Sequence, residues 1–397
     1  MAAAPRKSRR VEERIRVAIL TETSSQWSRH IIDGINRYIR EHEDWHVFIE
    51  PRGSNEIIAL PPRWKGDGVI ANIRDIETAA HLKRHNLPVV NTCPLALPSR
   101  FQFSQITTDK AACCKMAAKY FFDLGFRQFG YLNLIENAHD RETRFLFTGE
   151  VVKLGGHCRI YEVKKHGWGT PDWNLSVRGL AAWLKDLPKP VALFSCAVGR
   201  EVVAACKEGG LRMPEEVSLL LLNYDEIFGG MGHMPISGLI HACGAIGYEA
   251  ASQLSGMMSG REPANVSRYF APIGVETRRS SDTTAVADPL VAEAVHYIKE
   301  HACQGLQVNE LARHSGVSRR VLERRFHSHL GAAPAEIIRN VRMERAKELL
   351  RTTSRPIPDI AEASGFGTSQ YLATNFQQKL GVSPLKYRRQ FHGVPTP

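Results

Sequence analysis

The last hundred residues of the chain contain one pattern twice, and this repeat limits the possible folds more than any other feature of the sequence. Residues 308–334 and 358–391 each combine a short helical pattern, a glycine turn, a second helical pattern and a Gly–Pro stop. The two copies align at an offset of 49 or 50 residues, which pairs Ala312 with Ala361, Gly316 with Gly365, Leu322 with Leu372, Phe326 with Phe376, Gly331 with Gly381 and Pro334 with Pro384. The repeat predicts two helix-turn-helix motifs joined by one long helix.

The second helix of each motif carries an apolar face and a polar face. In the later motif we expect the apolar face to be buried and to consist of Tyr371, Leu372, Phe376 and Leu380. The opposite face carries short side chains that donate and accept hydrogen bonds, namely Thr368, Ser369, Gln370, Thr374 and Gln377. A helix that is buried on one side and polar on the other suits the major groove of DNA, and a plain helical bundle with a chance repeat is the alternative.

The later motif resembles the DNA-binding domain of AraC-type transcription regulators. The residues that carry this resemblance, in the order of the family's signature, are Ile360, Ala361, Gly365, Phe366, Tyr371, Leu372, Phe376, Gly381, Ser383, Pro384, Tyr387 and Arg388. The resemblance implies an all-α domain that places one reader helix of each motif in neighbouring major grooves.

The same resemblance implies which side chains contact DNA. Arginine pairs with guanine, glutamate accepts from cytosine, and short polar side chains suit either groove edge. The predicted base contacts come from Arg320, Glu323, Arg324, Ser369, Gln370 and Thr374. The side chains expected to complete the DNA contacts are Arg319, His327, Thr368 and Arg388. For Arg325 we expect a phosphate contact or a position flanking the helix.

Positive charge is concentrated at the two ends of the chain. Of the net charge of +11, residues 1–16 carry +4 and residues 283–397 carry +6, which leaves +1 for the middle. The C-terminal charge coincides with the reader helices, so we expect an attraction to phosphate that weakens steeply as salt rises. For the basic segment 1–14 we expect a disordered tail, and non-specific DNA contacts are the alternative.

Residues 15–281 alternate between strand and helix patterns. Apolar runs such as RVAIL (16–20) and VSLLLLN (217–223) are separated by helical patterns of about ten residues or more. This alternation predicts an α/β domain with parallel sheets and helices on both faces, since strands that are apolar throughout fit a sheet covered on both sides. Two successive sets of these units, over 15–130 and 140–280, predict two lobes.

This half of the chain resembles LacI-type regulators and periplasmic sugar-binding proteins. The resemblance rests on the closing segments ISGLI (236–240), GYEAASQL (247–254) and YFAPIGVETRRSS (269–281). It implies a two-lobed periplasmic-binding-protein-like domain that senses a sugar. A Rossmann enzyme is the competing interpretation, but no strand is followed by Gly-x-Gly-x-x-Gly, and no glycine-rich loop ends in Lys-Ser/Thr.

Ligands of parallel α/β sheets bind at the carboxyl ends of the strands, which directs attention to the side chains found there. A sugar requires carboxylates, guanidinium groups and a stacking ring, because each hydroxyl taken from water must find a partner. The candidate ligand-binding residues are Ser25, Trp27, Arg29, Asp109, Arg144, Trp173, Asp225 and His241. The LacI-type resemblance implies sugar contacts for Arg144, which precedes an apolar pair, and for Asp225, which follows the run LLLLN.

Three of these residues have an alternative role of equal or greater weight. We favour Asp109 as the cap of the following helix over Asp109 as a ligand contact. Trp173, like Trp168 before it, fits simple packing as well as stacking on a sugar ring. His241 fits a core or hinge position as well as a ligand contact.

The order of sensor first and double reader last resembles the regulators of bacterial xylose operons. Strings that carry this resemblance are LAAWLKDLP (180–188), DPLVAEAVHYIKEHACQG (288–305) and SRRVLERRF (318–326). It implies a monosaccharide effector, xylose or a related pentose, and no other cofactor. Such receptors usually carry an aspartate in the loop after PVALF, where this chain has Ser195 and Cys196. The departure removes a hydroxyl acceptor and leaves the choice between xylose and a related pentose open.

We therefore predict a cytoplasmic, sugar-responsive regulator that activates a sugar-utilisation operon. Its expected parts are the tail 1–14, an effector domain over 15–281, a linker over 282–289 and a DNA-binding domain over 290–392. Its expected partners are double-stranded DNA with repeated half-sites, a second copy of the chain and RNA polymerase. A soluble sugar-binding or transport protein without a DNA function is the alternative from another class.

Several other functions have no support in the sequence. The eight cysteines form no Cys-x-x-Cys pair and no Cys/His cluster, so no metal site is expected. No catalytic constellation is visible, so no enzymatic activity is expected. No apolar run approaches the ~20 residues that span a bilayer, so no membrane partner is expected.

Overall fold

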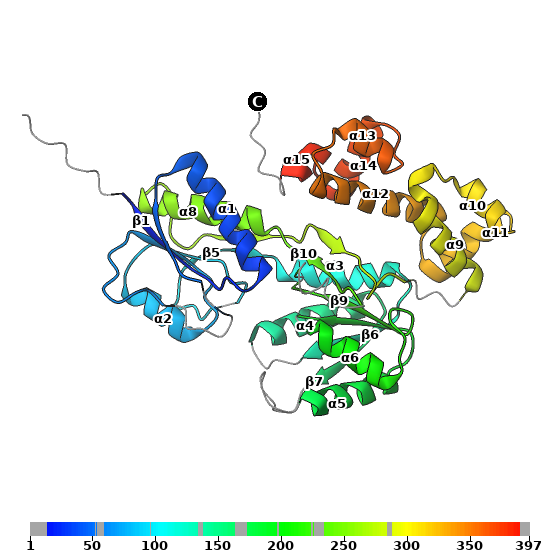
Figure 1. Ribbon diagram of the computed structural model, residues 1–397, viewed down its shortest axis with the longest axis horizontal. Helices are drawn as coiled ribbons and strands as arrows, with labels where there is room; N and C mark the ends of the chain where they lie inside the picture. Colours follow the sequence, from blue (N-terminus) through cyan, green and yellow to red (C-terminus); the bar gives the residue numbers. More distant parts are fainter. Residues whose placement is uncertain are drawn as a thin grey trace, which may run out of the picture. The chain divides into compact units, whose positions relative to one another are not determined.

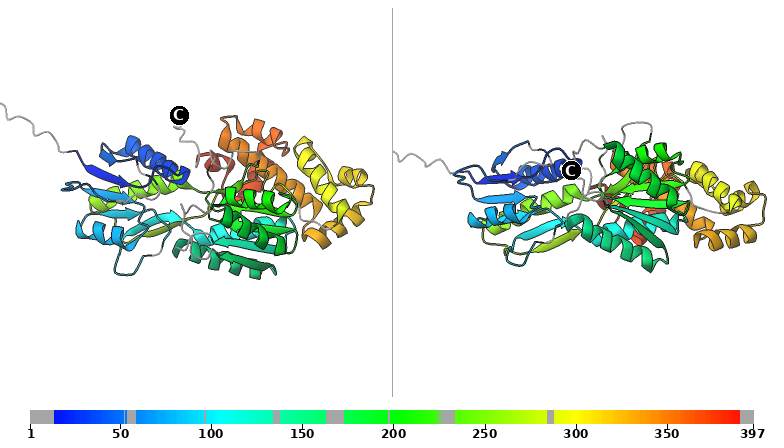
Figure 2. Two further views of the ribbon diagram at one scale, coloured as in Figure 1. Left: turned by 60° about the horizontal axis from the view of Figure 1, so that its bottom comes forward. Right: turned by 90° about the horizontal axis from the view of Figure 1, so that it is seen from below.

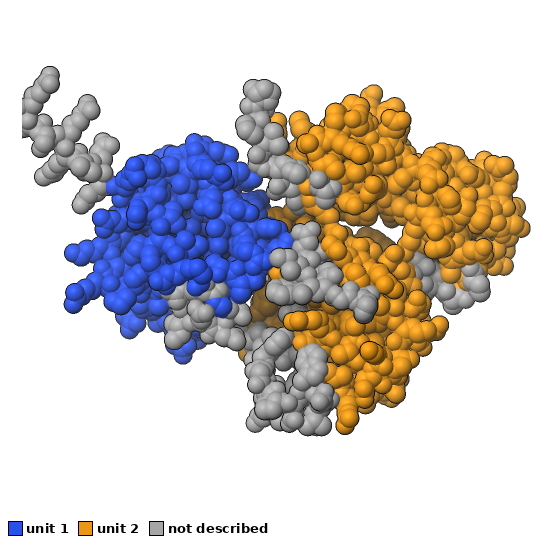
Figure 3. Space-filling model, viewed as in Figure 1, with its two compact units in different colours: residues 1–108, 243–270 blue, residues 109–242, 271–397 orange. Residues whose placement is uncertain are grey.

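The computed structural model divides the chain into two units, which are described separately (Figure 3). Unit 1 contains residues 1–108 and 243–270, and unit 2 contains residues 109–242 and 271–397. The described residues are 14–389 apart from 52, 54–58, 96, 134–137, 163–172, 197, 224, 226–233 and 284–287. The predicted tail, except Arg14, and the middle of the predicted linker lie outside this set.

The described part of unit 1 contains a sheet of six parallel strands in the order β11-β5-β4-β3-β1-β2. The strands and helices are β1 (Arg16–Leu20), α1 (Gln26–His42), β2 (His46–Ile49), β3 (Gly68–Ala71), α2 (Ile76–Arg84), β4 (Val89–Asn91), β5 (Ser104–Thr108), α8 (Cys243–Met258) and β11 (Ser267–Phe270). Alternate residues of β1 point to opposite faces. Val17 and Ile19 share an apolar cluster with α1 and α8. Ala18 and Leu20 share another with α2, so the sheet is covered on both sides.

In unit 2 the described strands form a second sheet in the order β12-β10-β9-β8-β6-β7, with β12 antiparallel to β10 and the other pairs parallel. The elements are α3 (Lys110–Asp123), β6 (Gln128–Asn133), α4 (Ala138–Lys153), β7 (His157–Glu162), α5 (Trp173–Asp186), β8 (Val191–Ser195), α6 (Gly199–Gly209), β9 (Val217–Leu221), β10 (Ser237–Ile240) and β12 (Gly274–Glu276). Leu193 and Leu219 pack with α5 and α6. Phe194 and Leu220 pack with α3 and α4 on the other face. The ribbon shows helices on both faces of this sheet (Figures 1 and 2).

The lobe boundaries expected from the sequence are wrong. Strand β6 (Gln128–Asn133) lies in the second sheet, although the expected first lobe ran to residue 130. Strand β11 returns to the first sheet and pairs in parallel with β5, although the expected second lobe included it. A strand joins the sheet in which its hydrogen-bond partners lie, and these partners are distant in sequence, so the alternation of strands and helices cannot assign it.

All the regular secondary structure among the described residues after the linker is helical. The helices are α9 (Pro289–His301), η1 (Ala302–Gln304), α10 (Val308–His314), α11 (Arg319–Leu330), α12 (Pro334–Thr352), α13 (Ile357–Ala363), α14 (Ser369–Leu380) and α15 (Pro384–Arg389). Leu322 and Phe326 belong to one apolar cluster, and Leu372 and Phe376 belong to another. The long helix α12 runs between the two helical groups (Figure 1). The predicted fold class is confirmed: two mostly parallel α/β sheets are followed by a helical region with two helix-turn-helix motifs.

No helix in the described part of the chain combines the length and the apolar character needed to cross a membrane.

Candidate functional site

Helices α11 and α14 occupy the positions predicted for the two DNA readers. Each begins at a hydroxyl cap, because Ser318 and Thr368 accept a hydrogen bond from the backbone N–H three residues later, at 3.4 and 3.2 Å. Each ends at a glycine in the left-handed conformation, with φ of 68° at Gly331 and 69° at Gly381. The repeat in the sequence is therefore a repeat in the structure.

The outer face of α11 is cationic. Its exposed side chains include Arg319, Arg320, Arg324 and His327. Glu323 is half-buried and its Oε1 accepts a hydrogen bond from Arg319 Nε at 2.8 Å, so this carboxylate is partly neutralised before any DNA arrives. Guanidinium groups of this kind suit phosphate or the acceptor edge of guanine.

The outer face of α14 is polar and carries no charge over its first two turns. Its exposed or half-exposed side chains there are Thr368, Ser369, Gln370 and Thr374. Thr374 Oγ1 donates to the carbonyl oxygen of Gln370 at 3.0 Å, which leaves the hydroxyl oxygen as an acceptor toward the groove. The two readers therefore differ in chemistry although they share their backbone pattern.

Two side chains of the second motif lie differently from their simplest expectation. Tyr371 was expected on the buried face of α14 but is 47% exposed, with its ring centroid 5.7 Å from that of Phe366. It precedes buried Leu372 by one residue, which turns it about 100° around the helix axis and out of the core. Arg388 is half-buried and donates to the carbonyl oxygen of Arg355, and burial lowers the pKa of its guanidinium. Its DNA contact stays a prediction.

The second motif also contacts the edge strand of the sheet in unit 2. Arg351 Nη2 of α12 donates to Glu276 Oε2 of β12 at 2.5 Å, and the two side chains are only 19% and 23% exposed. Ile273, just before β12, packs against the apolar cluster of the same motif. Because β12 pairs with β10, this contact joins a DNA reader to the sheet that carries the candidate effector residues.

Three candidate effector residues lie at one carboxyl edge of the sheet in unit 1, on the loop after β1 and the start of α1. Ser25 caps α1 by accepting a hydrogen bond from Ser28 N at 3.3 Å. Arg29 Nη1 donates to the carbonyl oxygens of Thr23 and Ser24 at 3.0 and 2.8 Å, which holds the loop against the helix. Trp27 is half-buried and packs against the apolar cluster beneath α1.

Three further candidates lie in unit 2. Asp109 Oδ1 accepts from Ala112 N at 2.9 Å, which confirms its role as the cap of α3. His241 follows β10 directly, and its Nε2 donates to the carbonyl oxygen of Leu222 at 2.7 Å. Burial lowers the pKa of His241, so the ring is neutral at pH 7 and its other nitrogen faces Cys113. Asp225 is half-buried after β9, the parallel neighbour of β10, so Asp225 and His241 belong to the same edge of the sheet.

The last two candidates are Arg144 and Trp173. Arg144 Nη1 of α4 forms an ion pair with Glu162 at the end of β7, and its side chain is 27% exposed. Trp173 begins α5, and its side chain lies outside the described set, as does Trp168. Within the part of the chain that the structure describes, no three His, Cys, Asp or Glu side chains come close enough together to hold a metal ion.

A buried polar cluster near the carboxyl ends of β6 and β8 could not be found from sequence patterns. The Tyr131 hydroxyl donates to Asp140 Oδ1 at 2.5 Å and lies 3.4 Å from Cys196 Sγ. Burial raises the pKa of the Asp140 carboxyl and that of the Cys196 thiol, and it lowers the pKa of His139 to about 4. The only local signal is a tyrosine within an apolar strand, and its partners lie 9 and 65 residues further along the chain.

Three protein-family models match successive parts of the chain. Residues 311–390 match the helix-turn-helix domain family, residues 118–281 match the periplasmic binding protein-like domain, and residues 16–96 match the XylR N-terminal domain. The fold and the two reader helices therefore define a DNA-binding transcription regulator, with an AraC-type double helix-turn-helix domain after a periplasmic-binding-protein-like domain.

Similarity to individual proteins extends over nearly the whole chain. The xylose operon regulatory protein of Haemophilus influenzae is 27% identical over 386 residues, which cover 95% of this chain and 99% of that protein. Its namesake in Escherichia coli K12 is 26% identical, with 95% and 97% covered. The solved structure of a xylose-binding transcription activator, xylR, aligns with a TM-score of 0.62 and 25% identity over 95% of this chain and 98% of that one. Along 95% of its length the chain is therefore similar to XylR-type transcription regulators.

LacI-type structures share the fold of the first part of the chain. The transcription regulator CcpA of Lactococcus lactis aligns with a TM-score of 0.52 and 13% identity, over 68% of this chain and 100% of that one. This likeness shows the fold of the sensor domain alone.

Replacing Arg324 with alanine should weaken binding to a preferred DNA site by about 1–3 kcal/mol and relax the preference at one base pair. The reason is that Arg324 is exposed on the reader helix, where a guanidinium can bind guanine through two hydrogen bonds. Competition binding with every single-base variant of the site measures the effect. Arg339→Ala, which removes an exposed arginine from α12, is the matched control. An equal loss on all sequences would show that Arg324 contacts phosphate only.

Proposed function

We propose that this protein activates a sugar-utilisation operon when a monosaccharide, xylose or a related pentose, binds its periplasmic-binding-protein-like domain. The observation that carries the proposal is the similarity to xylose operon regulatory proteins over 95% of this chain and nearly all of theirs. Similarity of this extent covers the sensor, the linker and both readers together, so a shared DNA domain alone does not account for it.

The DNA part of the proposal rests on the two readers and the helix between them. Helix α12 has 19 residues and is therefore about 28 Å long. Successive major grooves on one face of DNA are about 34 Å apart, so a helix of this length suits two readers that enter neighbouring grooves. We propose base contacts from Arg320, Glu323 and Arg324 in the first motif. In the second motif we propose them from Ser369, Gln370 and Thr374.

The effector part rests on side chains at the carboxyl edge of each sheet, and each unit is considered by itself. Asp225 and Arg144 offer an acceptor and a donor for sugar hydroxyls from unit 2. Ser25, Trp27 and Arg29 offer hydroxyl, ring and guanidinium groups from unit 1. Asp109 and His241 have partners within unit 2, so we propose that they support the site through α3 and β10. Trp173 is the proposed stacking ring.

The departure at Ser195 and Cys196 is compatible with a sugar site. Ser195 is 1% exposed and its hydroxyl donates to the carbonyl oxygen of Leu132 at 3.3 Å. Cys196 lies in the cluster with Tyr131 and Asp140. We propose that Asp140 supplies the carboxyl group that this corner otherwise lacks, held by a hydrogen bond from Tyr131, while burial raises the pKa of this carboxyl group.

Regulation by such a ligand requires a structural element whose conformational equilibrium is shifted both by sugar binding and by DNA binding. We propose that the protein acts in the cytoplasm as a homodimer on repeated half-sites and contacts RNA polymerase when it activates. The contact of Arg351 with Glu276 is one path by which a shift of the sheet in unit 2 would reach the second reader.

The experiment that tests this function is binding of the purified full-length protein to DNA fragments from around its own gene, repeated with a panel of pentoses and hexoses. We expect salt-sensitive binding to one fragment and a change in affinity or footprint with one pentose. Glucose and galactose serve as controls for the panel, and a fragment from an unrelated gene serves as the control for DNA.

Two outcomes would count against the proposal in different ways. Binding to DNA without a response to any sugar would retain the reader and reject the effector assignment. Absence of DNA binding at low salt, with and without sugars, would reject the regulator itself.

A further inference from the structure

Asp288 lies near the end of the predicted linker, directly before helix α9. Asp288 is the N-cap of α9, and its Oδ1 accepts hydrogen bonds from Leu290 N at 2.9 Å and Val291 N at 3.4 Å. Pro289 follows at the first helical position, where its missing N–H costs nothing. These two features, an aspartate cap and a proline at the first helical position, are usual at the start of a helix.

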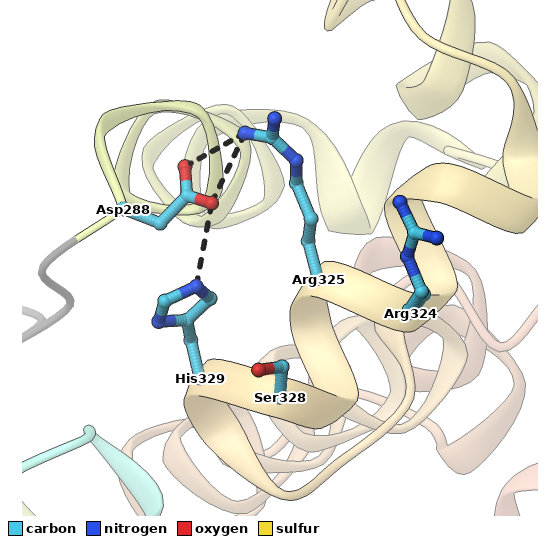
Figure 4. Close-up of a pocket in the computed structure, with 5 residues that line it drawn as sticks. All are labelled: Asp288, Arg324, Arg325, Ser328 and His329. Atoms are coloured by element: carbon cyan, nitrogen blue, oxygen red, sulfur yellow. Dashed lines mark hydrogen bonds and ion pairs between the residues drawn. The ribbon is translucent and has the colours of Figure 1, made fainter.

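The same carboxylate also holds the first reader helix. Arg325 Nη1 of α11 lies 3.2 and 3.1 Å from the two oxygens of Asp288, and His329 Nε2, one turn further along α11, lies 3.4 Å from Oδ2. The Asp288 side chain is only 11% exposed, while those of Arg325 and His329 are 42% and 36% exposed. Figure 4 shows both side chains converging on Asp288 from α11, with Arg324 turned away from it.

The second motif has a polar contact at the corresponding position. At the offset of 50 residues, His329 corresponds to Lys379 of α14, and Lys379 Nζ donates to Asn340 Oδ1 of α12. At the same offset Asn340 falls two residues from Asp288. In both motifs a polar side chain of an earlier long helix, at the N-cap of α9 and two turns into α12, therefore contacts the last turns of the reader. The chemistry differs, because Asp288 forms ion pairs with α11, whereas Asn340 accepts a hydrogen bond from Lys379 through a neutral amide.

We propose that Asp288 is a positioning residue for DNA recognition: it fixes the rotation of α11 about its axis and so sets where Arg320 and Arg324 meet the base edges. The proposal rests on the proposed function. Arg325 and Arg324 are neighbours about 100° apart on the helix, so an anchor on one determines the direction of the other. Asp288 also lies within the predicted linker 282–289. A conformational change in the sensor domain that displaces the linker would therefore move α11 through its contacts with the Asp288 carboxylate.

The Asp288→Asn variant separates this role from simple stability. Asparagine caps a helix about as well as aspartate, so α9 keeps its start, but the charge that holds Arg325 and His329 is removed. Arg325→Met removes the other partner and keeps an apolar stem of similar length. Asp282→Asn is the matched control, because Asp282 pairs with Lys299 of α9 at 2.7 Å and does not touch α11.

The test selects binding sites from a randomised DNA duplex library with the full-length wild-type protein and with each variant. The block of bases read by the first motif is identified as the block in which Arg324→Ala loses its preference. For Asp288→Asn and Arg325→Met we expect discrimination in that block to fall about ten-fold, the size of one lost bidentate contact, with the other block unchanged. The double variant should lose no more than either single variant, because both remove one interaction.

Three results would overturn the proposal. Asp288→Asn could select the wild-type sites while Arg325→Met does not, in which case Arg325 contacts DNA directly. Asp288→Asn could raise affinity for all duplexes equally, which is an effect of net charge alone. Asp282→Asn could reproduce the loss, in which case α11 is not specifically involved. If the wild-type protein selects no sequence at all, the proposed function fails, and this outcome is distinct from the other three.

Discussion

Replacing Gly365 with alanine should destabilise the DNA-binding domain by about 2–5 kcal/mol, whereas the same replacement at Gly316 should cost about 1–2 kcal/mol. The two glycines are equivalent in the repeat, and both have positive φ, 78° at Gly365 and 67° at Gly316. Alanine in this left-handed conformation costs about 1–2 kcal/mol at either position.

The difference between the two glycines comes from packing. A Cβ at residue 365 would lie 2.8 Å from Cys303 Cα and 3.0 Å from the carbonyl oxygens of Ala302 and Cys303. These are backbone atoms that cannot swing aside, so the turn of the second motif must move away from η1, and overpacking of this kind costs about 1–3 kcal/mol more. A Cβ at Gly316 would meet nothing within 4 Å.

Hydrogen exchange at the backbone amides of α13 and α14, in the full-length protein, measures this pair of variants. It reports the opening free energy of one region, which a melting curve of a multidomain chain does not. Gly316→Ala is the internal control for the left-handed penalty, read at α10 and α11. Equal losses of opening free energy in the two variants would contradict the prediction, because the turn at Gly365 would then accommodate the added Cβ without strain.

Replacing Phe147 with alanine should destabilise unit 2 by about 3–5 kcal/mol, whereas Phe145→Ala should change its stability by no more than about 0.5 kcal/mol. Both residues lie on α4, two positions apart. Phe147 is 0% exposed, and its ring centroid lies 4.7 Å from that of Phe194 and 6.1 Å from that of Tyr131. Phe145 is 77% exposed.

The loss at Phe147 has two parts, the transfer of a ring out of the core and the cavity that remains. The cavity would border Tyr131, whose hydroxyl holds Asp140, so we also expect weaker effector binding. Urea denaturation followed by hydrogen exchange in β6 and β8 measures stability, and calorimetric titration with whichever sugar changes DNA binding measures effector binding. A Phe145→Ala variant as unstable as Phe147→Ala would contradict the burial assigned to these two rings.

The sequence predicted most of what depends on short stretches of chain. The reader helices and their glycine stops were predicted because they are set within a few residues, and the structure adds the caps at Ser318 and Thr368, which act over the same short range. The cap at Asp109 follows the same rule. The fold class followed from the period of apolar residues, because a strand covered on both faces and an amphipathic helix leave different patterns.

Tyr371 marks the limit of periodicity within a single helix. Its position next to Leu372, in a series continued by Phe376 and Leu380, suggested a buried face, but only one stripe of α14 meets the core, and Tyr371 lies outside it. Arg325 shows the same limit for charge. As one arginine among several on α11 it was expected to contact phosphate or to flank the helix, and only the structure shows that it forms an ion pair with Asp288.

What the sequence by itself determined is the set of local elements: two capped helix-turn-helix motifs, the strands and helices of a two-lobed sensor, and an excess of positive charge beside the readers. The tertiary structure alone decided which sheet β6 and β11 join, why Gly365 differs from Gly316, and how Tyr131, Asp140 and Cys196 meet. The physical reason is the separation along the sequence of the residues that each interaction joins. Caps and periodicity act within a few residues, whereas strand partners, close backbone approaches and buried polar clusters join residues that only the completed fold brings together.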